Sequence, residues 1–346
     1  MAGIALLGAG LFAQEAHLPA LLEHNANLLA IYSRSTTSAQ SLLSKVNNNN
    51  LNLTIYADDH PTHTLDALLA RPDITAVVIA LPITAQPAIV RKCLLAGKHV
   101  LCEKPLAKDT ATARALIKDY ETQYQPRGQL FAIAEQFRHD RAFTRARDLV
   151  QTHLRGKVAH VHARMWGHID PVDKNQWYET EWRKTPAYQG GFVLDGGVHF
   201  IALVRYVSGL EVVRTASLTA QVYEFLPPLD TVNAALSFGN GAAGSVSISF
   251  ASVKRAFEFV FVGEDGCVIV EGAGVEGSSR VVCEGKEGEV VLEEVIEGNG
   301  VSEEVRAFLE SVEKGKLDER LAAGEAFADL AVVQSLCEGG GVVETL

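Results

Sequence analysis

The spacing of apolar residues in the first part of the chain predicts a parallel β-sheet whose strands are joined by helices. Short, continuous apolar runs are typical of strands that are buried on both faces. Amphipathic stretches at 64–70 and 85–96 have the spacing of crossover helices. The expected strands are 4–7, 28–32, 76–80, 100–102 and a last one at 130–134. This alternation is the pattern of an α/β domain with a doubly wound sheet.

Beyond about residue 155 the pattern changes to longer strands separated by glycine-containing turns. Such turns stand at 239–241, 264–266 and 285–288. Helical spacing returns at 303–312 and 324–337. Strands are expected at 159–165, 211–225, 231–237, 243–250, 257–263 and 267–271. We therefore expect an α+β domain with a large, mostly antiparallel, open-faced sheet that helices cover on one side.

The length of the chain favours two domains, because 346 residues exceed what one hydrophobic core usually supports. The change of pattern predicts a first domain at 1–127 and a second at 128–346. The uncovered face of the second sheet predicts a homodimer or higher homo-oligomer, with sheet packed against sheet.

A glycine motif follows the first expected strand directly. Residues 8–13 read Gly-Ala-Gly-Leu-Phe-Ala, which is G-x-G-x-x-A between an apolar strand and a helix. Gly8 would allow a tight turn and Gly10 would let the backbone approach a pyrophosphate, with Leu11 and Phe12 opening the helix. The motif predicts a dinucleotide-binding Rossmann domain.

The end of the second expected strand indicates which dinucleotide is bound. Sites specific for NAD usually place an acid there to bind the ribose hydroxyls, whereas this chain has Ser33 and Arg34. A guanidinium beside hydroxyl groups offers charge-assisted hydrogen bonds to a 2′-phosphate. We therefore expect NADP rather than NAD. The alternative is that Arg34 is a solvated loop residue.

Charge and cysteine content narrow the class of protein further. A net charge of −11 argues against a nucleic-acid or anionic-membrane partner, and the expected partner is a small-molecule substrate. The five cysteines form no C-x-x-C pair and have no metal-ligand spacing with histidine. We expect reduced thiols, no metal site and a cytoplasmic protein. We expect no signal peptide, and no apolar stretch long enough to span a bilayer.

A lysine closes the strand expected at 100–102. Glu103-Lys104-Pro105 lies where open α/β sheets bind ligands, beyond the carboxyl ends of the strands. There Lys104 can transfer a proton during hydride transfer, with Glu103 holding the lysine.

The second domain carries its own candidate residues. Asp195 and His199 are four apart, so on a helix both project from one face. A carboxylate beside an imidazole can orient it for proton transfer. The alternative is a helix cap with a packed histidine. Arg183 and Tyr188, in the aromatic loop at 167–189, and Gln136 are candidates to contact substrate. His17, His60, His63 and His168 are interpreted as surface or packed residues.

Three segments together resemble the Gfo/Idh/MocA oxidoreductase family, and within it the fungal NADP-dependent members. They are residues 8–13, 96–105 and 190–199, and the resemblance runs across nearly the whole chain. It implies an N-terminal Rossmann domain, an open-faced C-terminal sheet, and a lysine, an aspartate and a histidine in the cleft between them. Those roles fall on Lys104, Asp195 and His199.

The chain departs from the family pattern at three positions. Ile83 and Gln86 stand in a loop where the family often has Pro-Asn and then a histidine. Ala202 stands where an acid often follows the histidine. Cofactor contacts in that loop are then expected from the backbone of Leu81 and Pro82.

The predicted reaction is reversible hydride transfer between nicotinamide C4 and a carbonyl or secondary alcohol of a sugar, polyol, aldehyde or dihydrodiol. Lys104 or His199 would supply the proton to the alkoxide, with Asp195 orienting the histidine. The alternative is a protein that senses NADP and regulates a partner without turnover.

Overall fold

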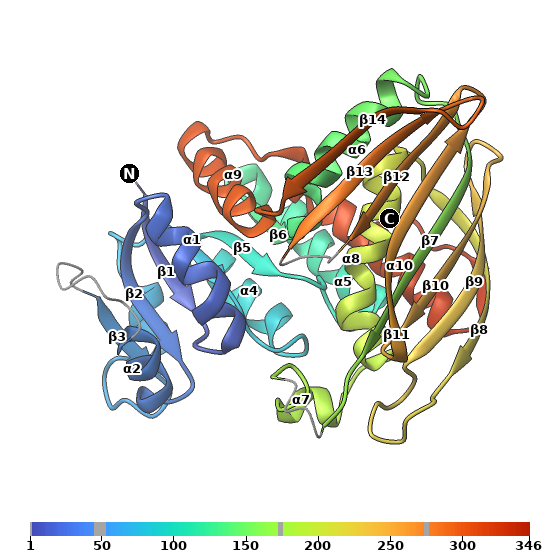
Figure 1. The fold of residues 1–346 in the computed structure, drawn as a ribbon. Coiled ribbons are helices and arrows are strands. Elements are labelled where there is room, and N and C mark those ends of the chain that lie inside the picture. Colours follow the sequence, from blue (N-terminus) through green and yellow to red (C-terminus); the bar gives the residue numbers. More distant parts are fainter. Residues whose placement is uncertain (1, 45–52, 172–175, 273–276) are drawn as a thin grey trace. The chain divides into compact units, whose positions relative to one another are not determined.

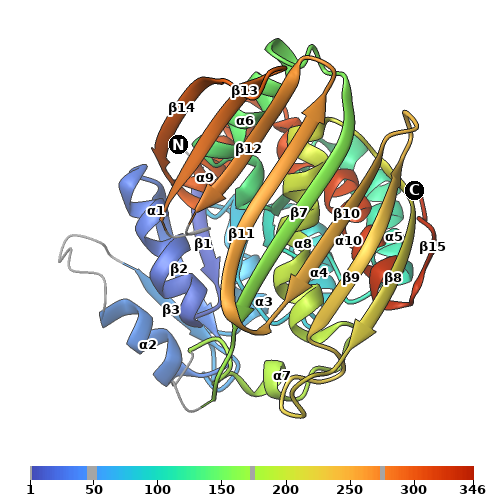
Figure 2. The ribbon, with the colours of Figure 1, turned by 45° about the vertical axis from the view of Figure 1, so that its right-hand side comes forward.

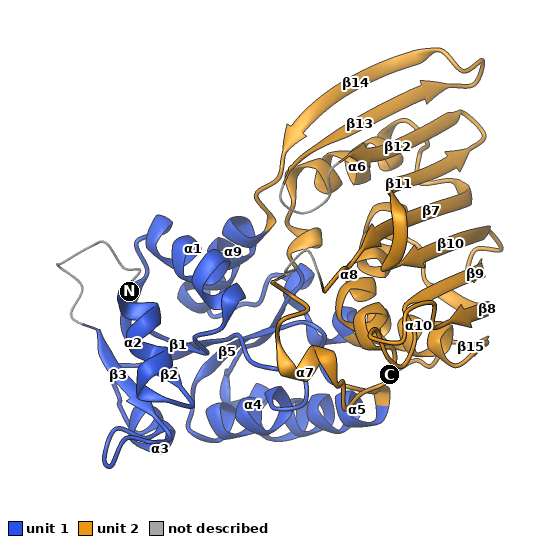
Figure 3. Cartoon of the chain, turned by 60° about the horizontal axis from the view of Figure 1, so that its bottom comes forward, with its two compact units in different colours: residues 1–107, 111–135, 301–326 blue, residues 108–110, 136–300, 327–346 orange. Residues whose placement is uncertain are grey.

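The computed structural model describes residues 2–44, 53–171, 176–272 and 277–346 (Figure 1). The asparagine run at 47–50, whose polarity predicts a surface loop, lies outside the described residues. The chain forms two compact units. The first comprises residues 1–107, 111–135 and 301–326, and the second comprises 108–110, 136–300 and 327–346 (Figure 3).

The first unit is built on a six-stranded sheet in which every strand pair is parallel. The order is β3-β2-β1-β4-β5-β6. The central strands β1 and β4 consist of apolar and small residues that are fully buried, as expected for strands covered on both faces. The strands are β1 (Gly3–Leu7), β2 (Asn27–Ser33), β3 (Thr54–Ala57), β4 (Ala76–Ile79), β5 (His99–Glu103) and β6 (Phe131–Ala134). This is the predicted Rossmann sheet.

Helices of the first unit join these strands (Figure 1). A π-helical turn at Ala13–His17 leads from the glycine motif directly into the first of them. The helices are α1 (Leu18–Glu23), α2 (Thr36–Ser44), α3 (Leu65–Leu69), α4 (Gln86–Leu95), α5 (Thr110–Asp119) and α9 (Gly300–Lys314), with further short turns at Tyr120–Tyr124, Gln125–Arg127 and Glu319–Leu321. Helices α5 and α9 belong to this unit except for their first residues, Thr110 and Gly300.

The division of the chain differs from the predicted boundary at 127/128. Strand β6 is the sixth strand of the first sheet, and residues 301–326 return to the first unit. The return is explained by burial, because Val305 and Phe308 of α9 are fully buried in the same apolar core as Ile4 and Leu101. The chain therefore passes between the units several times, at 107/108, 110/111, 135/136, 300/301 and 326/327, instead of once.

The second unit is built on a nine-stranded sheet in the order β14-β13-β12-β11-β7-β10-β9-β8-β15 (Figure 2). Only β7 and β10 pair in parallel among these neighbours. The strands are β7 (Val158–His168), β8 (Val212–Ala220), β9 (Thr231–Phe238), β10 (Ala243–Ser249), β11 (Ala251–Gly263), β12 (Gly266–Gly272), β13 (Ser278–Gly285), β14 (Val290–Glu297) and β15 (Gly340–Val342). The prediction of a large, mostly antiparallel sheet is confirmed.

Helices α6 (Arg141–Thr152), α8 (Gly191–Ser208) and α10 (Ala323–Cys337) cover one face of this sheet (Figure 2). Two shorter helical segments are α7 (Glu181–Lys184) and a turn at Gln136–Arg138. Contrary to the expectation from sequence, α8 is long and apolar enough to cross a membrane, but 89% of it is buried inside the protein. That burial is typical of a core helix.

The strand expected at 211–225 ends earlier, at Ala220. The carboxylate of Asp230, which is fully buried, accepts hydrogen bonds from the backbone N–H groups of Val222 and Tyr223 at 2.9 and 2.8 Å. These amides are therefore bonded to a side chain instead of a neighbouring strand.

Candidate active site

The two glycines of the motif have different structural roles. Gly8 has φ +125°, and a Cβ atom placed on it would lie 2.2 Å from the carbonyl oxygen of Ala80, so the close approach of β1 to the end of β4 requires glycine. Gly10 is exposed, and a Cβ atom there would meet nothing within 4 Å. Open space at Gly10, followed by half-buried Leu11 and Phe12, fits a loop that receives a pyrophosphate.

The end of β2 presents the two residues that were predicted to choose the dinucleotide. Ser33 is buried and Arg34 is exposed. Two acids lie nearby, but they come from the segment after β3 and have other partners. Asp58 accepts a hydrogen bond from the hydroxyl of Tyr32 at 2.7 Å, and Asp59 accepts from the backbone N–H and hydroxyl of Thr36. These hydrogen bonds from Thr36 lower the pKa of Asp59.

The loop after β4 is held by the residue that departs from the family pattern. Gln86 is buried, and its amide nitrogen donates a hydrogen bond to the carbonyl of Leu81 at 3.0 Å. Its amide oxygen accepts from the thiol of Cys102 at 3.4 Å. Burial raises the pKa of Cys102 well above its ordinary value, so this thiol is a packing residue. Gln86 thus fixes the backbone of Leu81 and Pro82.

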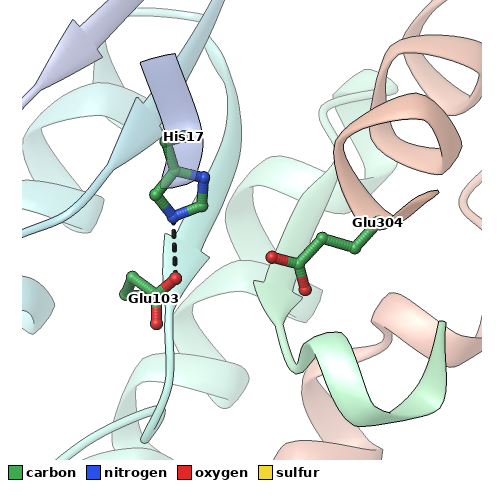
Figure 4. A group of neighbouring side chains, drawn as sticks. All are labelled: His17, Glu103 and Glu304. Atoms are coloured by element: carbon green, nitrogen blue, oxygen red, sulfur yellow. Dashed lines mark hydrogen bonds and ion pairs between the residues drawn. The ribbon is translucent and has the colours of Figure 1, made fainter. Parts of the chain in front are cut away.

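The carboxyl end of β5 carries Glu103, which is buried, and Lys104, which is half-buried. Nε2 of His17 lies 2.7 Å from Oε1 of Glu103 (Figure 4). His17 is fully buried and ends the π-helical turn, a feature that often marks functional sites. His17 is therefore packed, as one of the two predicted alternatives had it, and it also has a buried polar partner, Glu103, which lies 86 positions away in the sequence.

In the second unit, Asp195 and His199 both lie on α8 and both are buried. Asp195 forms an ion pair with Arg183, with Oδ2 2.7 Å from Nε. The guanidinium of Arg183 also lies 4.0 Å from the ring centroid of Trp182. Arg183, predicted to hold substrate, thus holds one of the predicted catalytic residues.

Three further residues of the second unit lie around α8. The imidazole of His199 stacks on Phe137, with 4.9 Å between ring centroids. Gln136, beside Phe137, and Tyr188 are buried. Burial and the neighbouring carboxylate of Asp195 raise the pKa of Tyr188, so its hydroxyl stays protonated. Ala202, where the family often has an acid, is fully buried in the same helix.

The predicted site residues therefore fall into two groups, one in each unit. Lys104 and the predicted cofactor residues belong to the first unit, where sequence reasoning missed His17 and Glu304. Asp195, His199, Arg183, Tyr188 and Gln136 belong to the second. The sequence signal for His17 was its position nine residues after Gly8, on the helix that opens from the glycine motif.

Comparison with known proteins defines the class. Residues 2–125 match an oxidoreductase family with an NAD-binding Rossmann fold, and residues 143–269 match the GFO/IDH/MocA C-terminal domain. The chain belongs to the Gfo/Idh/MocA family of NAD(P)-dependent oxidoreductases. Dehydrogenase FPY6 of Fusarium mangiferae is 39% identical to it over an alignment of 351 positions that covers 98% of each chain. The family resemblance inferred from sequence is confirmed.

Solved structures of similar proteins agree with this fold. An oxidoreductase from Thermotoga maritima has a TM-score of 0.84 at 25% identity, covering 99% of this chain and 98% of its own. A 3-ketoreductase from Actinomadura kijaniata, solved with NADP and TDP-benzene, has a TM-score of 0.78 at 21% identity, covering 98% and 97%. Because the 3-ketoreductase is only 21% identical to this chain, its similarity concerns the fold alone.

Proposed function

We propose that this protein transfers a hydride between NADP(H) and a carbonyl or secondary alcohol of a small molecule from the sugar, polyol, aldehyde or dihydrodiol class. The observation that carries the proposal is the first unit itself, where an open glycine loop and Lys104 stand at the carboxyl ends of β1 and β5 in one parallel sheet. That edge is where such sheets bind nucleotides.

The residues of the first unit have distinct tasks in holding the cofactor. Gly8 and Gly10 let the backbone reach the pyrophosphate, with Leu11 and Phe12 opening the helix. The backbone of Leu81 and Pro82, fixed by Gln86, lines the next loop. Ser33 and Arg34 offer a hydroxyl and a guanidinium to the 2′-phosphate. The bound nicotinamide supplies the hydride.

Proton transfer is assigned to the ionisable residues of both units. Lys104 or His199 gives a proton to the oxygen that becomes an alkoxide during reduction, and takes it back in the oxidising direction. Glu103 holds Lys104, and stacking on Phe137 fixes the ring plane of His199. Asp195 orients His199, since both residues lie on α8 and the ion pair with Arg183 holds the carboxylate of Asp195 in place.

The cofactor assignment is tested by titrating the protein with NADPH and NADH while following nicotinamide fluorescence. We expect tighter binding of NADPH, and a roughly 10- to 100-fold loss of NADPH affinity in Arg34→Ala, because a charge-assisted hydrogen bond contributes about 1.5–3 kcal/mol. Arg127→Ala removes another exposed arginine of the same unit and serves as the control. Equal affinities for the two cofactors, or an unchanged Arg34→Ala, would contradict the assignment.

Turnover is tested with a panel of aldoses, polyols, aldehydes and dihydrodiols. Lys104→Met and His199→Gln should both bind NADPH. The variant that lacks the proton-transferring residue should turn over about 10²- to 10⁴-fold more slowly than the wild type. If both variants kept wild-type turnover, the mechanism would be wrong. NADPH binding without turnover of any compound in the panel would favour the cofactor-sensing alternative.

A further inference from the structure

A cluster of buried side chains lies in the first unit, at a point where three distant segments meet. It consists of His17 from the π-helical turn, Glu103 from β5 and Glu304 from α9. One ligand atom from each residue lies within 4.8 Å of the other two. Figure 4 shows the carboxyl group of Glu304 directed toward the hydrogen-bonded pair of His17 and Glu103. Side chains of the types that bind metal ions are thus gathered at one buried point.

Glu304 is the member of this cluster that lacks a partner. Its side chain is fully buried, and neither carboxyl oxygen has a hydrogen-bond partner among the described residues. Buried polar groups are nearly always bonded, and an ionised carboxylate in such a place loses its hydration without compensation. Glu304 therefore needs a positive ligand, which is either a proton or a metal ion.

The charges around Glu304 favour an ion with two positive charges. Burial is the largest cause that raises the pKa of Glu304, Glu103 and Glu135 raise it further, and Lys104 lowers it. When all these groups are ionised, three carboxylates stand against one ammonium, which leaves two negative charges in excess. A proton on Glu304 removes one of them, whereas a divalent cation balances both.

The cluster also offers enough donor atoms for a metal ion. They are Nε2 of His17, Oε1 of Glu103 and both oxygens of Glu304, which together make the four donors of a structural zinc site. Metal bonds of about 2.1 Å place neighbouring donors about 3.0–3.5 Å apart and opposite donors about 4.2 Å apart. One donor from each residue gives separations from 2.7 Å to at most 4.8 Å, so small side-chain rotations suffice to surround an ion.

We propose that His17, Glu103 and Glu304 form a structural site for a divalent transition-metal ion such as Zn²⁺. The ion joins α9 to β5 and to the turn after the glycine motif, all within the first unit. When it binds, the proton shared by His17 and Glu103 and the proton on Glu304 are released to water. The expectation of no metal site rested on cysteine spacing, whereas these ligands meet only in the fold. The ion takes no part in the proposed hydride transfer.

The first test measures metal in the full chain without cofactor or substrate. The protein is stripped with a chelator, incubated with excess Zn²⁺, separated from loosely bound ion by gel filtration and analysed by plasma mass spectrometry. We expect one Zn²⁺ per chain. Mg²⁺ and Ca²⁺ should not bind under the same conditions, because they prefer oxygen ligands whereas an imidazole nitrogen suits zinc. Competition with a chromophoric chelator then gives the affinity.

Glu304→Gln removes one charged ligand at nearly constant size. Loss of a group that merely supports a metal ligand costs about 10- to 100-fold in affinity, so loss of the ligand itself should weaken Zn²⁺ binding at least roughly 100-fold. Glu304→Met is a second variant for the case in which Glu304→Gln folds poorly. The matched control is Glu303→Gln, one position earlier in α9. The carboxylate of Glu303 is partly exposed and lies 2.9 Å from Nε of Arg306, so this variant should bind Zn²⁺ like the wild type.

Histidines at the surface are a possible source of adventitious zinc, and a separate variant measures their contribution. The rings of His60 and His63 stack with 4.5 Å between centroids, and His63 is exposed. The double variant His60→Gln, His63→Gln should keep the tightly bound Zn²⁺ of the wild type. A zinc ion that this variant loses and that Glu304→Gln keeps would be an adventitious ion only, and the proposal would fail.

A bound ion must also stabilise the folded chain, because the unfolded chain does not hold the three ligands together. At free Zn²⁺ of about 100 times the dissociation constant, the folding equilibrium constant should rise about 100-fold in urea unfolding. Neither Glu304 variant should show this rise. Without metal, Glu304→Met should be at least as stable as the wild type, because it replaces an unpartnered carboxyl group with an apolar side chain.

Several outcomes would overturn the proposal. Without stoichiometric Zn²⁺ in the wild type, Glu304 would hold only a proton. Equal zinc content in the wild type and both Glu304 variants, or an equal loss in Glu303→Gln, would place the ion elsewhere. Equal binding of Mg²⁺ would contradict the class of ion. Because these measurements need neither cofactor nor substrate, a lack of turnover would refute the proposed function and leave the metal site supported.

Discussion

Replacing the first glycine of the motif by alanine tests whether Gly8 serves the fold. The Cβ atom of Gly8→Ala would lie 2.2 Å from the carbonyl oxygen and 2.9 Å from the carbonyl carbon of Ala80, which are both backbone atoms. The residue would also keep φ near +125°, which disfavours any side chain. Backbone strain costs about 1–3 kcal/mol and overpacking about the same, so we expect a loss of about 2–6 kcal/mol of stability.

Gly10→Ala is the matched variant, with the same added methyl group two positions further on. Nothing lies within 4 Å of the new atom, so stability should change by no more than about 0.5 kcal/mol. The methyl group would instead occupy the space that the pyrophosphate needs. Losing one backbone contact to a phosphate should weaken NADPH binding roughly 10- to 100-fold.

The two variants are compared by urea unfolding, followed by circular dichroism, and by NADPH titration. Gly8→Ala should unfold at clearly lower urea, whereas Gly10→Ala should unfold like the wild type and bind NADPH weakly. Equal stability of the two variants would refute the structural role of Gly8. Wild-type affinity in Gly10→Ala would refute the assignment of this loop to the pyrophosphate.

Two further predictions concern the second unit. In a double-mutant cycle of Arg183→Met and Asp195→Asn, the largely buried ion pair predicts a coupling of about 1–3 kcal/mol in unfolding free energy, and purely additive effects would contradict the pair. Leu218 and Val253, with exposed fractions of 81% and 80%, support the proposed homo-oligomer through the open sheet face. Light scattering should show that the wild type is an oligomer and that the double variant Leu218→Lys, Val253→Lys dissociates more easily. The control Leu95→Lys, in the first unit, should leave the oligomer unchanged. A wild type that is monomeric at micromolar concentration would exclude the homo-oligomer.

Features set by local sequence were predicted well. The run before Gly8 is a fully buried strand, Lys104 follows the end of β5, and Asp195 and His199 share one helix, because strand burial and helix periodicity follow from neighbouring residues. The hairpin turn at 285–288 also lies between two paired strands, β13 and β14.

Features that depend on contacts between distant residues could not be predicted from the local sequence. His17 finds Glu103, and Val305 and Phe308 join the core of the first unit, through contacts that no local pattern encodes. Glu303 and Glu304 are identical in type and adjacent, yet one is partly exposed beside Arg306 and the other is fully buried. Only tertiary packing distinguishes them.

The return of α9 to the first unit has a consequence for the order in which the protein folds during synthesis. Residues 301–326 leave the ribosome after almost the whole second unit, yet Val305 and Phe308 are fully buried in the core that begins at Ile4. Until then the nascent first unit has an apolar surface that its own strands cannot cover, a target for chaperones. Glu304 arrives with the same helix, so its carboxyl group joins the buried pair of His17 and Glu103 only near the end of translation.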